Sequence, residues 1–447
     1  MKAGKSLAIL TMAGALALGM AGCGTSSGDP TGAGSTAETT AAETTAAPTP
    51  VTLTMAGWSL DTTPEFKLLA DGFHAANPQY TIDIKEYDPS KYGELMLADL
   101  SAGAAPDLVP IKEAKVIYQW SSALKDVSDV AAGLPKDVAG VDAYTVDGKV
   151  YASPYRMDSW ILFYNTDLFA KAGIPVPDGK WTWEQYAATA KELTTKLAAE
   201  KSPDDQAIKG TYEHSWQSTL QGFANAQAGD IFSGDYSYMK PYYERVLDLQ
   251  KAGAQETLAT ITTNKLTYQA SFGKQHAAMM LMGSWYLATL TAQQASGDAD
   301  TFAWGVAPAP QVDASTTSNP VTFGGPTGMA INSKISADKL EAAKAFLAYI
   351  ASADAGKALA GIGNVPSSAD PSVITTLFAQ KGMPTDDLSK FALSTHIVKP
   401  ENPVGENIAA LQTILGEAHT AIMTEATALD AALADAGARA HSEGGVS

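Results

Sequence analysis

Strand-like and helix-like patterns of apolar residues alternate along the chain from residue 51 onward. Val51–Gly57 (VTLTMAG) alternates apolar with small or polar residues, which is typical of a strand. Apolar residues recur at helical spacing in Thr63–Ala76. Tyr80–Tyr87 predicts a second strand, Tyr92–Ser101 a second helix and Asp107–Ile111 a third strand. This strand–helix–strand order predicts an α/β fold with βαβ units.

The same alternation continues to the end of the sequence. Pro154 is expected to form a turn between two of the later strands. Ligands of α/β proteins gather beyond the carboxyl ends of strands, so the residues just after Gly57, Ile111 and Ser153 are expected near a binding site. The later strands that the pattern predicts are Lys149–Ser153, Trp160–Tyr164, Ala277–Met282 and Thr327–Asn332. The later helices are Trp183–Ala199, with Thr182 as N-cap, Tyr242–Ala252, Lys339–Ala351 and most of Glu406–Ala440.

The first residues predict an export signal rather than part of the fold. Lys2 and Lys5 precede an apolar run over residues 6–22, which is short for a membrane-spanning helix. The run ends at Cys23, and Met20-Ala21-Gly22-Cys23 resembles a lipobox, with Met where Leu is usual. We therefore expect residues 1–22 to be a lipoprotein signal peptide and Cys23 to carry a palmitate-type lipid anchor at the outer face of the cytoplasmic membrane. A plain secretory signal with an incidental cysteine is the alternative.

Composition divides the remainder into a tether and a large folded part. Residues 24–50 contain no large apolar side chain, which predicts that residues 23–50 form a lipid anchor and a disordered tether. Residues 51–447 are too many for one compact core and favour two lobes. The net charge of −18 argues against nucleic acid or anionic lipid as ligand, although a solvated acidic surface explains most of it. Cys23 is the one cysteine, so no internal disulfide can form.

Three blocks of sequence carry a family resemblance. The second runs from Phe272 through Met279 to Trp285, with Gly273 two residues earlier than usual, and the third joins Pro308-Ala309-Pro310 to Phe323-Gly324-Gly325. Together they resemble the extracellular solute-binding proteins, family 1, of carbohydrate ABC transporters, the maltose-binding-protein class. The residues of the first block are Gly148, Lys149, Tyr151, Pro154, Tyr164, Asn165, Leu168, Phe169, Lys171, Ala172, Gly173, Thr182 and Trp183.

The resemblance implies a two-lobe periplasmic-binding-protein-like fold of the class II type. Each lobe would be a mixed sheet flanked by helices, with the ligand cleft between them. The expected crossings lie at Pro154, at Phe323–Pro326 and at Asn364–Pro366. The expected first lobe is 51–157 with 326–364, and the second is 158–325 with 365–447. The resemblance also implies a monomer that works with ABC transporter permease subunits and needs no cofactor.

A sugar site needs aromatic rings for the apolar faces of the sugar and polar groups for its hydroxyls. Trp58, Ser59 and Asp61 follow the first predicted strand, and Glu113 follows the third. All four are predicted to contact the ligand. The alternatives are a core tryptophan at Trp58 and a solvated loop acid at Glu113.

The remaining candidates lie in or near the family blocks. Asp158 precedes Asn165 at the spacing of a sugar-binding acid in the maltose-binding class, and Arg156 is expected to pair with Asp158 or to hold a hydroxyl. Trp285 resembles the stacking tryptophan of the family. A structural role is the alternative for His214, and a hinge role for the two glycines. The remaining predicted ligand contacts are His214, Trp216, Gly324 and Gly325.

Enzyme motifs are missing from the sequence. It holds no Gly-x-Ser-x-Gly elbow, no His-Glu-x-x-His and no phosphate loop, and its six histidines lack ligand spacing. Met279, Met280 and Met282 are expected in the core rather than in a metal site. The sequence therefore predicts a non-enzymatic, substrate-binding lipoprotein that delivers a sugar or oligosaccharide to an ABC importer. A glycan-binding sensor or adhesin is the alternative, and an extracellular glycosidase a more remote one.

Overall fold

The computed structural model describes residues 49–61, 63–394, 396–401 and 403–446. These residues belong to one compact unit, Pro48–Ser447. The predicted signal peptide, the predicted lipidation site Cys23 and most of the predicted tether lie outside the described residues. None of the helices in the described ranges is both long and apolar enough to span a membrane.

The strands of this unit form one large mixed sheet and one small hairpin. The large sheet has nine strands in the order β2-β1-β3-β10-β6-β8-β7, with β11 paired to β10 and β9 paired to β6. The hairpin pairs β4 with β5. Their bounds are β1 Val51–Gly57, β2 Tyr80–Glu86, β3 Leu108–Ile111, β4 Thr145–Val146, β5 Lys149–Val150, β6 Ala152–Asn165, β7 Lys209–Tyr212, β8 Ala277–Gly283, β9 Trp304–Pro308, β10 Val321–Ile331 and β11 Ile397–Pro400.

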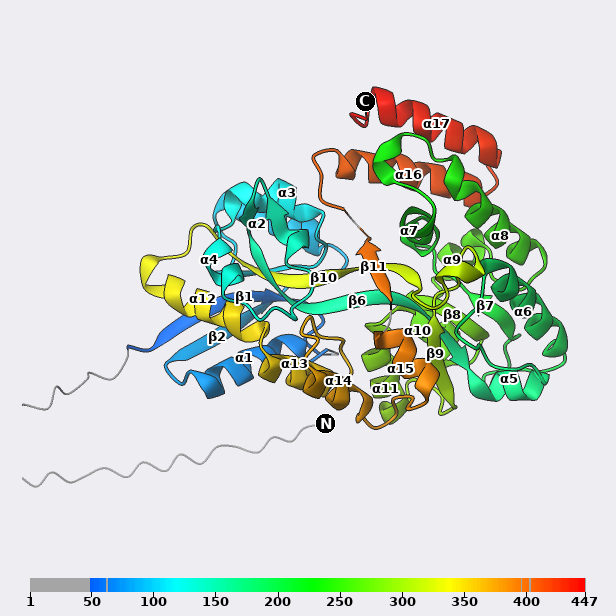
Figure 1. Ribbon diagram of the computed structural model, residues 1–447, viewed down its shortest axis with the longest axis horizontal. Coiled ribbons are helices and arrows are strands. Elements are labelled where there is room, and N and C mark those ends of the chain that lie inside the picture. The colour runs from blue at the N-terminus through cyan, green and yellow to red at the C-terminus, as the bar shows by residue number, and fades with distance from the viewer. Residues whose placement is uncertain (1–48, 62, 395, 402, 447) are drawn as a thin grey trace, which may run out of the picture. The chain divides into compact units, whose positions relative to one another are not determined.

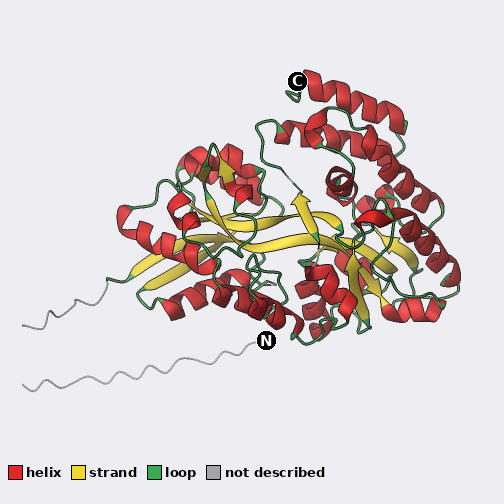
Figure 2. Cartoon of the chain, in the orientation of Figure 1, coloured by secondary structure: helices red, strands yellow, loops and turns green. Residues whose placement is uncertain are grey.

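Helices pack along the sheet (Figures 1 and 2). Helices α1 and α12 contact β2 and β1, whereas α16 and α17 pack on each other and on α8. The bounds are α1 Glu65–Ala76, α2 Tyr92–Ala102, α3 Val116–Trp120, α4 Ser128–Ala132, α5 Thr166–Ala172, α6 Trp183–Lys196, α7 Ser218–Gln227, α8 Lys240–Lys251, α9 Leu258–Thr263, α10 Tyr268–Gly273, α11 Tyr286–Ser296, α12 Ala337–Ile350, α13 Ala353–Ala360, α14 Pro371–Phe378, α15 Asp387–Ser394, α16 Ile408–Met423 and α17 Leu429–Ser442.

Local sequence sets several helix ends. The predicted N-cap Thr182 forms a capping box with Gln185, in which each side chain bonds to the other residue's backbone N–H. Helix α1 ends at Ala76, and the backbone N–H of its C-cap, Asn77, donates to the Phe73 carbonyl at 2.9 Å. Asn165 caps α5 by accepting a hydrogen bond from the Leu168 backbone N–H at 3.0 Å. The carboxyl end of β6 is thereby tied to the helix that follows it.

The expectation of a turn at Pro154 was wrong. Pro154 lies inside β6, which runs without a break from Ala152 to Asn165. A register shift between Thr327 and Gly328 of β10 lies opposite Pro154. Proline cannot donate a ladder hydrogen bond, and a local irregularity of this kind accommodates it within a strand.

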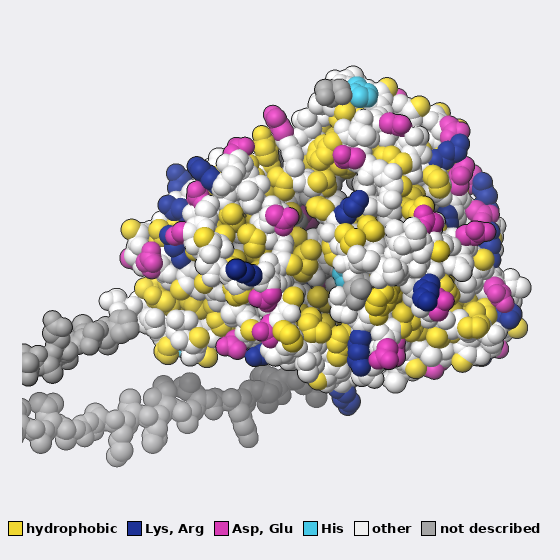
Figure 3. All heavy atoms as spheres, in the orientation of Figure 1, with side chains coloured by type: hydrophobic (Ala, Val, Ile, Leu, Met, Phe, Trp, Pro, Cys, Tyr) yellow, Lys and Arg dark blue, Asp and Glu magenta, His cyan; other side chains and the backbone are white. Residues whose placement is uncertain are grey.

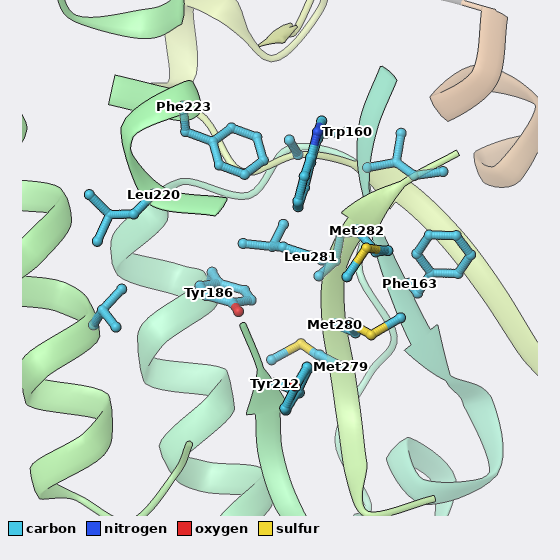
Figure 4. Packing of buried hydrophobic residues seen from close by; sticks show 14 of the residues in the cluster. Trp160, Phe163, Tyr186, Tyr212, Leu220, Phe223, Met279, Met280, Leu281 and Met282 are labelled. Atoms are coloured by element: carbon cyan, nitrogen blue, oxygen red, sulfur yellow. The ribbon is translucent and has the colours of Figure 1, made fainter. Parts of the chain in front are cut away.

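Buried apolar side chains in the described residues form two separate clusters. The first lies around β1, β3, α1 and α12, and the second around β8, α6, α7 and α16. Met279, Met280 and Met282 are fully buried in the second cluster, as Figure 4 shows, which confirms their expected core role. The chain changes cluster between Tyr155 and Trp160 in β6, between Phe323 and Met329 in β10, and between Leu359 and Ala360 at the end of α13.

Candidate functional site

Strands β6 and β10 run side by side between the two clusters (Figure 1). In this stretch Ser159 pairs with Gly324, Asp158 with Gly325, and Arg156 with Thr327. A third segment joins them, because the Met157 backbone N–H donates to the Val365 carbonyl at 3.0 Å. Three crossing segments therefore meet at Arg156–Asp158.

A buried charge network occupies this meeting point. Arg156 Nη1 lies 2.7 Å from Glu65 Oε2, and Arg156 Nε lies 2.9 Å from Asp158 Oδ2. Glu65 opens helix α1 and is 0% exposed, and Asp158 is 5% exposed. Asn364 Nδ2 donates to Glu65 at 3.0 Å, and Ser284 Oγ donates to Asp158 at 3.1 Å. The network therefore links α1, the three crossing segments and the residue that follows β8.

One guanidinium here serves two carboxylates. Burial raises the pKa of Glu65 and of Asp158, and the charge of Arg156 opposes that rise in both. The pairing of Arg156 with Asp158, one of its two predicted roles, is confirmed. Because both ion pairs and a bond to Thr327 Oγ1 at 3.2 Å occupy the guanidinium, we expect Arg156 to be a structural link more than a ligand contact.

An aromatic surface lies next to the network. We define it as His214, Trp216, Tyr268 and Trp285. Trp216, in the loop after β7, is 41% exposed, and the other three are partly buried. The ring centroid of Trp216 lies 4.5 Å from His214, 5.8 Å from Tyr268 and 6.4 Å from Trp285. The predicted residues His214, Trp216 and Trp285 are therefore brought together.

Buried groups hold these rings in place. Trp160 is 0% exposed, and its ring meets Trp285 at 5.6 Å and Trp216 at 6.4 Å, edge to face. Figure 4 shows Trp160 beside Phe223, above the methionines of β8. Trp285 lies flat on the end of β8, because a Cβ on Gly283 would fall 2.0 Å from the indole. Gly283 is therefore required by this close approach.

His214 belongs to the surface as a neutral ring. Its Nδ1 lies 2.7 Å from the Tyr212 hydroxyl, and burial lowers the pKa of His214 to about 4. A neutral imidazole adds hydrogen-bonding capacity without a positive charge. The alternative of a structural hydrogen-bonder fits this contact, although the ring also lies against Trp216.

The structure does not place all the first-lobe candidates at this surface. Trp58 is 7% exposed, with ring centroids of Phe66 and Tyr92 each 4.8 Å away, so the expected ligand contact is replaced by core packing. Ser59 follows it with a positive φ of 54°, and Asp61 is exposed. Trp58 directly follows strand β1, and burial of its large apolar indole against these rings is favourable.

Glu113 faces a carboxylate that sequence reasoning missed. Glu401, just after β11, donates its backbone N–H to the Gly324 carbonyl at 2.7 Å. Burial raises the pKa of Glu401 to about 7; a hydrogen bond from Ser218 opposes this rise and the charge of Glu113 adds to it. Glu113 itself pairs with Lys115 at 2.6 Å. Two carboxylates that are far apart in the sequence therefore interact here.

The two predicted glycines differ in their surroundings. A Cβ on Gly324 would fall 2.0 Å from the Asp158 carbonyl oxygen, so strand packing requires glycine there. A Cβ on Gly325 would meet nothing within 4 Å, and Gly325 is partly exposed. Gly325 is thus the glycine with open space beside it.

Sequence reasoning also missed Glu65, Trp160 and Tyr268. Glu65 looked like an ordinary acidic residue in a first helical turn, Trp160 like part of an apolar strand, and Tyr268 lay outside every block. The pairing of β6 with β8 places Trp160 opposite Gly283, two residues before Trp285. The sequence does not show this pairing, so it could not place Trp160 beside Trp285.

Groups of three or more metal-ligating side chains are not found among the described residues.

On the face shown in Figure 3, acidic and basic side chains are scattered rather than gathered into one patch. The acidic net charge is therefore spread over the surface that this view shows. The arrangement at the aromatic surface suits the recognition of a polar, ring-faced solute.

Comparison with known proteins identifies the family. Residues 69–381 match the model of a bacterial extracellular solute-binding protein. The sn-glycerol-3-phosphate-binding periplasmic protein UgpB of Shigella flexneri is 31% identical over 170 residues, which cover 35% of this chain and 36% of that protein. The chain therefore matches about a third of the length of this curated relative.

Solved structures match over most of the chain. A sugar transporter from Rhizobium etli in an open conformation is 29% identical with a TM-score of 0.74, over 87% of this chain and 99% of that one. An ABC substrate-binding protein from Listeria monocytogenes, in complex with cycloalternan, is 18% identical with a TM-score of 0.73, over 89% and 100%. These matches confirm the predicted α/β fold of the maltose-binding-protein class. The chain belongs to the bacterial extracellular solute-binding proteins.

Proposed function

We propose that this chain captures a neutral sugar or oligosaccharide outside the cell and delivers it to the permease of an ABC importer. The observation that carries the proposal is the aromatic surface, where Trp216 is 41% exposed beside Tyr268 and Trp285. Indole and phenol rings cover the apolar faces of a sugar, and nearby polar groups bond its hydroxyls. The similarity to the sugar transporter from Rhizobium etli and to the cycloalternan-bound protein from Listeria monocytogenes supports a carbohydrate ligand.

The proposed site combines residues from both sides of the crossing strands. Trp216, Trp285, His214 and Tyr268 would cover the sugar, and Gly325 would offer backbone groups. Asp158 and Glu113 would accept hydroxyl hydrogen bonds, as would Glu401. Ser59 and Asp61 remain candidates from the first lobe, and Arg156 would hold Asp158 in place.

The solute would enter between two lobes that close around it. We propose the boundaries predicted from the sequence, 51–157 with 326–364 and 158–325 with 365–447. The changes of buried cluster in β6, in β10 and at the end of α13 support them. Contacts to both lobes would stabilise the closed form, so the solute would shift the population towards it. The chain would act as a monomer and perform no chemistry on its cargo.

The curated relatives favour a second candidate, a phosphate ester such as sn-glycerol 3-phosphate. The ion pairs of Arg156 with Glu65 and Asp158 already occupy the guanidinium, which disfavours it as an anchor for a phosphate group. Lys112, an exposed cation 5.6 Å from the Trp58 ring, is the better candidate for that role. Two carboxylates and one guanidinium leave an acidic balance at the network, which disfavours an anion.

Thermal denaturation with a panel of ligands separates these candidates. Neutral mono- and oligosaccharides should raise the melting temperature, because binding to the folded state alone stabilises it. A rise with sn-glycerol 3-phosphate but with no neutral sugar would favour the second candidate. A rise with peptides or polyamines alone would contradict both.

Membrane attachment is proposed through Cys23, with residues 24–50 as the tether. The support is the position of the one cysteine at the end of an apolar run. Replacing Cys23 with Ser should release the protein from the membrane fraction into the medium. If the variant stays on the membrane as before, the lipid anchor is wrong.

A further inference from the structure

A small cavity lies behind the loop that carries the aromatic surface. Its walls come from the loop Glu213–Trp216 and from helices α7, α8, α9 and α16. The space that a water molecule's centre can occupy is about 10 Å³. About 10–15 Å³ by this measure is enough for one water molecule.

Buried polar atoms that line this cavity have no hydrogen-bond partner in the part of the chain that the structure describes. Three of their side chains are nearly fully buried, with Thr219 2%, Gln255 3% and His419 6% exposed. An unpaired polar atom in such a place is costly, and native proteins rarely leave several together. The atoms are Thr219 Oγ1, Gln250 Nε2, Gln255 Oε1 and His419 Nε2.

The chemistry of these atoms selects the occupant. Gln250 Nε2 is a donor and Gln255 Oε1 is an acceptor, so the occupant must both accept and donate. The nearby Glu213 already pairs with Arg245 at 2.9 Å, in a buried ion pair. Burial lowers the pKa of His419 to about 4, so this ring is neutral at neutral pH. A cation would meet the Gln250 amide N–H and an anion the Gln255 carbonyl, whereas water suits both.

We propose that the cavity binds an ordered water molecule, held by Gln250, Gln255 and Thr219 and within reach of His419. The water joins helices α7, α8 and α16 directly behind His214 and Trp216. It thereby supports the loop whose rings form the outer part of the aromatic surface. The proposal does not depend on which solute the protein carries.

A crystal structure of the full chain tests the proposal directly. We expect a well-ordered water with hydrogen bonds of about 2.7–3.2 Å to at least two of the side chains of Thr219, Gln250 and Gln255. Side chains that instead pair with one another around a dry cavity, or density for an ion, would overturn it.

Thr219→Val supplies a second test. The expected change in melting temperature depends on whether the Thr219 hydroxyl binds a water molecule or is unpaired. If the Thr219 hydroxyl binds water, its removal lowers the melting temperature by about 1–2 °C. If the hydroxyl is unpaired, its removal leaves the melting temperature unchanged or raises it, and the proposal fails. Thr322→Val is the matched control, because Thr322 is equally buried and its Oγ1 donates to the Trp160 carbonyl at 2.6 Å. That control must lower the melting temperature in either case.

Discussion

The substitution Arg156→Met removes the cation from the buried charge network. Glu65 and Asp158 lose partners at 2.7 and 2.9 Å and stay 0% and 5% exposed. Removing one partner of a buried pair leaves an uncompensated charge and typically costs about 3–5 kcal/mol. Because two carboxylates share this guanidinium, we expect a loss at the upper end of that range at neutral pH.

The loss should depend on pH. Burial already raises the pKa of Glu65 and of Asp158, and without Arg156 nothing comparable opposes that rise. A carboxyl whose folded-state pKa lies above its unfolded value destabilises the protein increasingly as pH rises past about 4. The deficit of the variant should therefore be smaller near pH 5 than near pH 7.5.

Chemical denaturation at the two pH values measures this, with Lys115→Met as the control. Lys115 and Glu113 form a pair at 2.6 Å whose side chains are 33% and 44% exposed. Such a pair is worth less than about 1 kcal/mol. Because Lys115 also opposes the raised pKa of Glu401, this control is compared at pH 7.5 alone. The reasoning is refuted if Arg156→Met costs no more than this control, or if its cost is the same at both pH values.

Three further predictions concern the aromatic surface, the crossing strands and two histidines. Trp216→Ala should weaken solute binding about 10-fold, or about 1.4 kcal/mol, in a calorimetric titration. It should change the melting temperature little, because the indole is 41% exposed. An unchanged affinity would contradict the proposed site. Gly324→Ala should lower the yield of folded protein or its melting temperature, since the new Cβ would fall 2.0 Å from a backbone oxygen. Gly325→Ala is the control and should fold normally, because its Cβ would meet nothing within 4 Å. Equal effects of the two substitutions would contradict the packing. Burial lowers the pKa of His214 and His419 to about 4, so the unfolded state binds more protons below about pH 6.5. Each ring should therefore lower stability towards pH 4 by about 1.4 kcal/mol per pH unit. Because the raised pKa values of Glu65, Asp158 and Glu401 act in the opposite direction, denaturant midpoints are compared with those of His214→Asn and His419→Asn; variants with the same pH dependence as the unaltered protein would exclude this.

The sequence predicted the elements well because period and caps are local properties. The first strand was expected at Val51–Gly57 and is found there, and Thr182 is the N-cap of α6 as expected. Pro154 misled the prediction, because a proline is tolerated inside a strand next to a bulge. Tyr155 is the extra residue of that bulge, and it shows only in the pairing of β6 with β10, which is far away in sequence.

The candidate site was predicted only where residue type and position coincided. Trp285 follows a predicted strand and carries a ring that suits a sugar, whereas Trp216 was predicted from the family resemblance alone. Trp58 met the same criteria, yet its ring packs against Phe66 and Tyr92. Glu401 lay beyond prediction, because its place beside Ser218 depends on how β11 pairs with β10. Burial and long-range register, which single-sequence patterns do not contain, separate these cases.

Calorimetric titration of the purified protein with neutral oligosaccharides and with sn-glycerol 3-phosphate tests the central claim most directly. We predict saturable binding of at least one neutral carbohydrate, weakened when Trp216 or Trp285 is replaced by Ala, and no comparable binding of the phosphate ester. Binding of the phosphate ester alone, or carbohydrate binding that is indifferent to both substitutions, would contradict the claim.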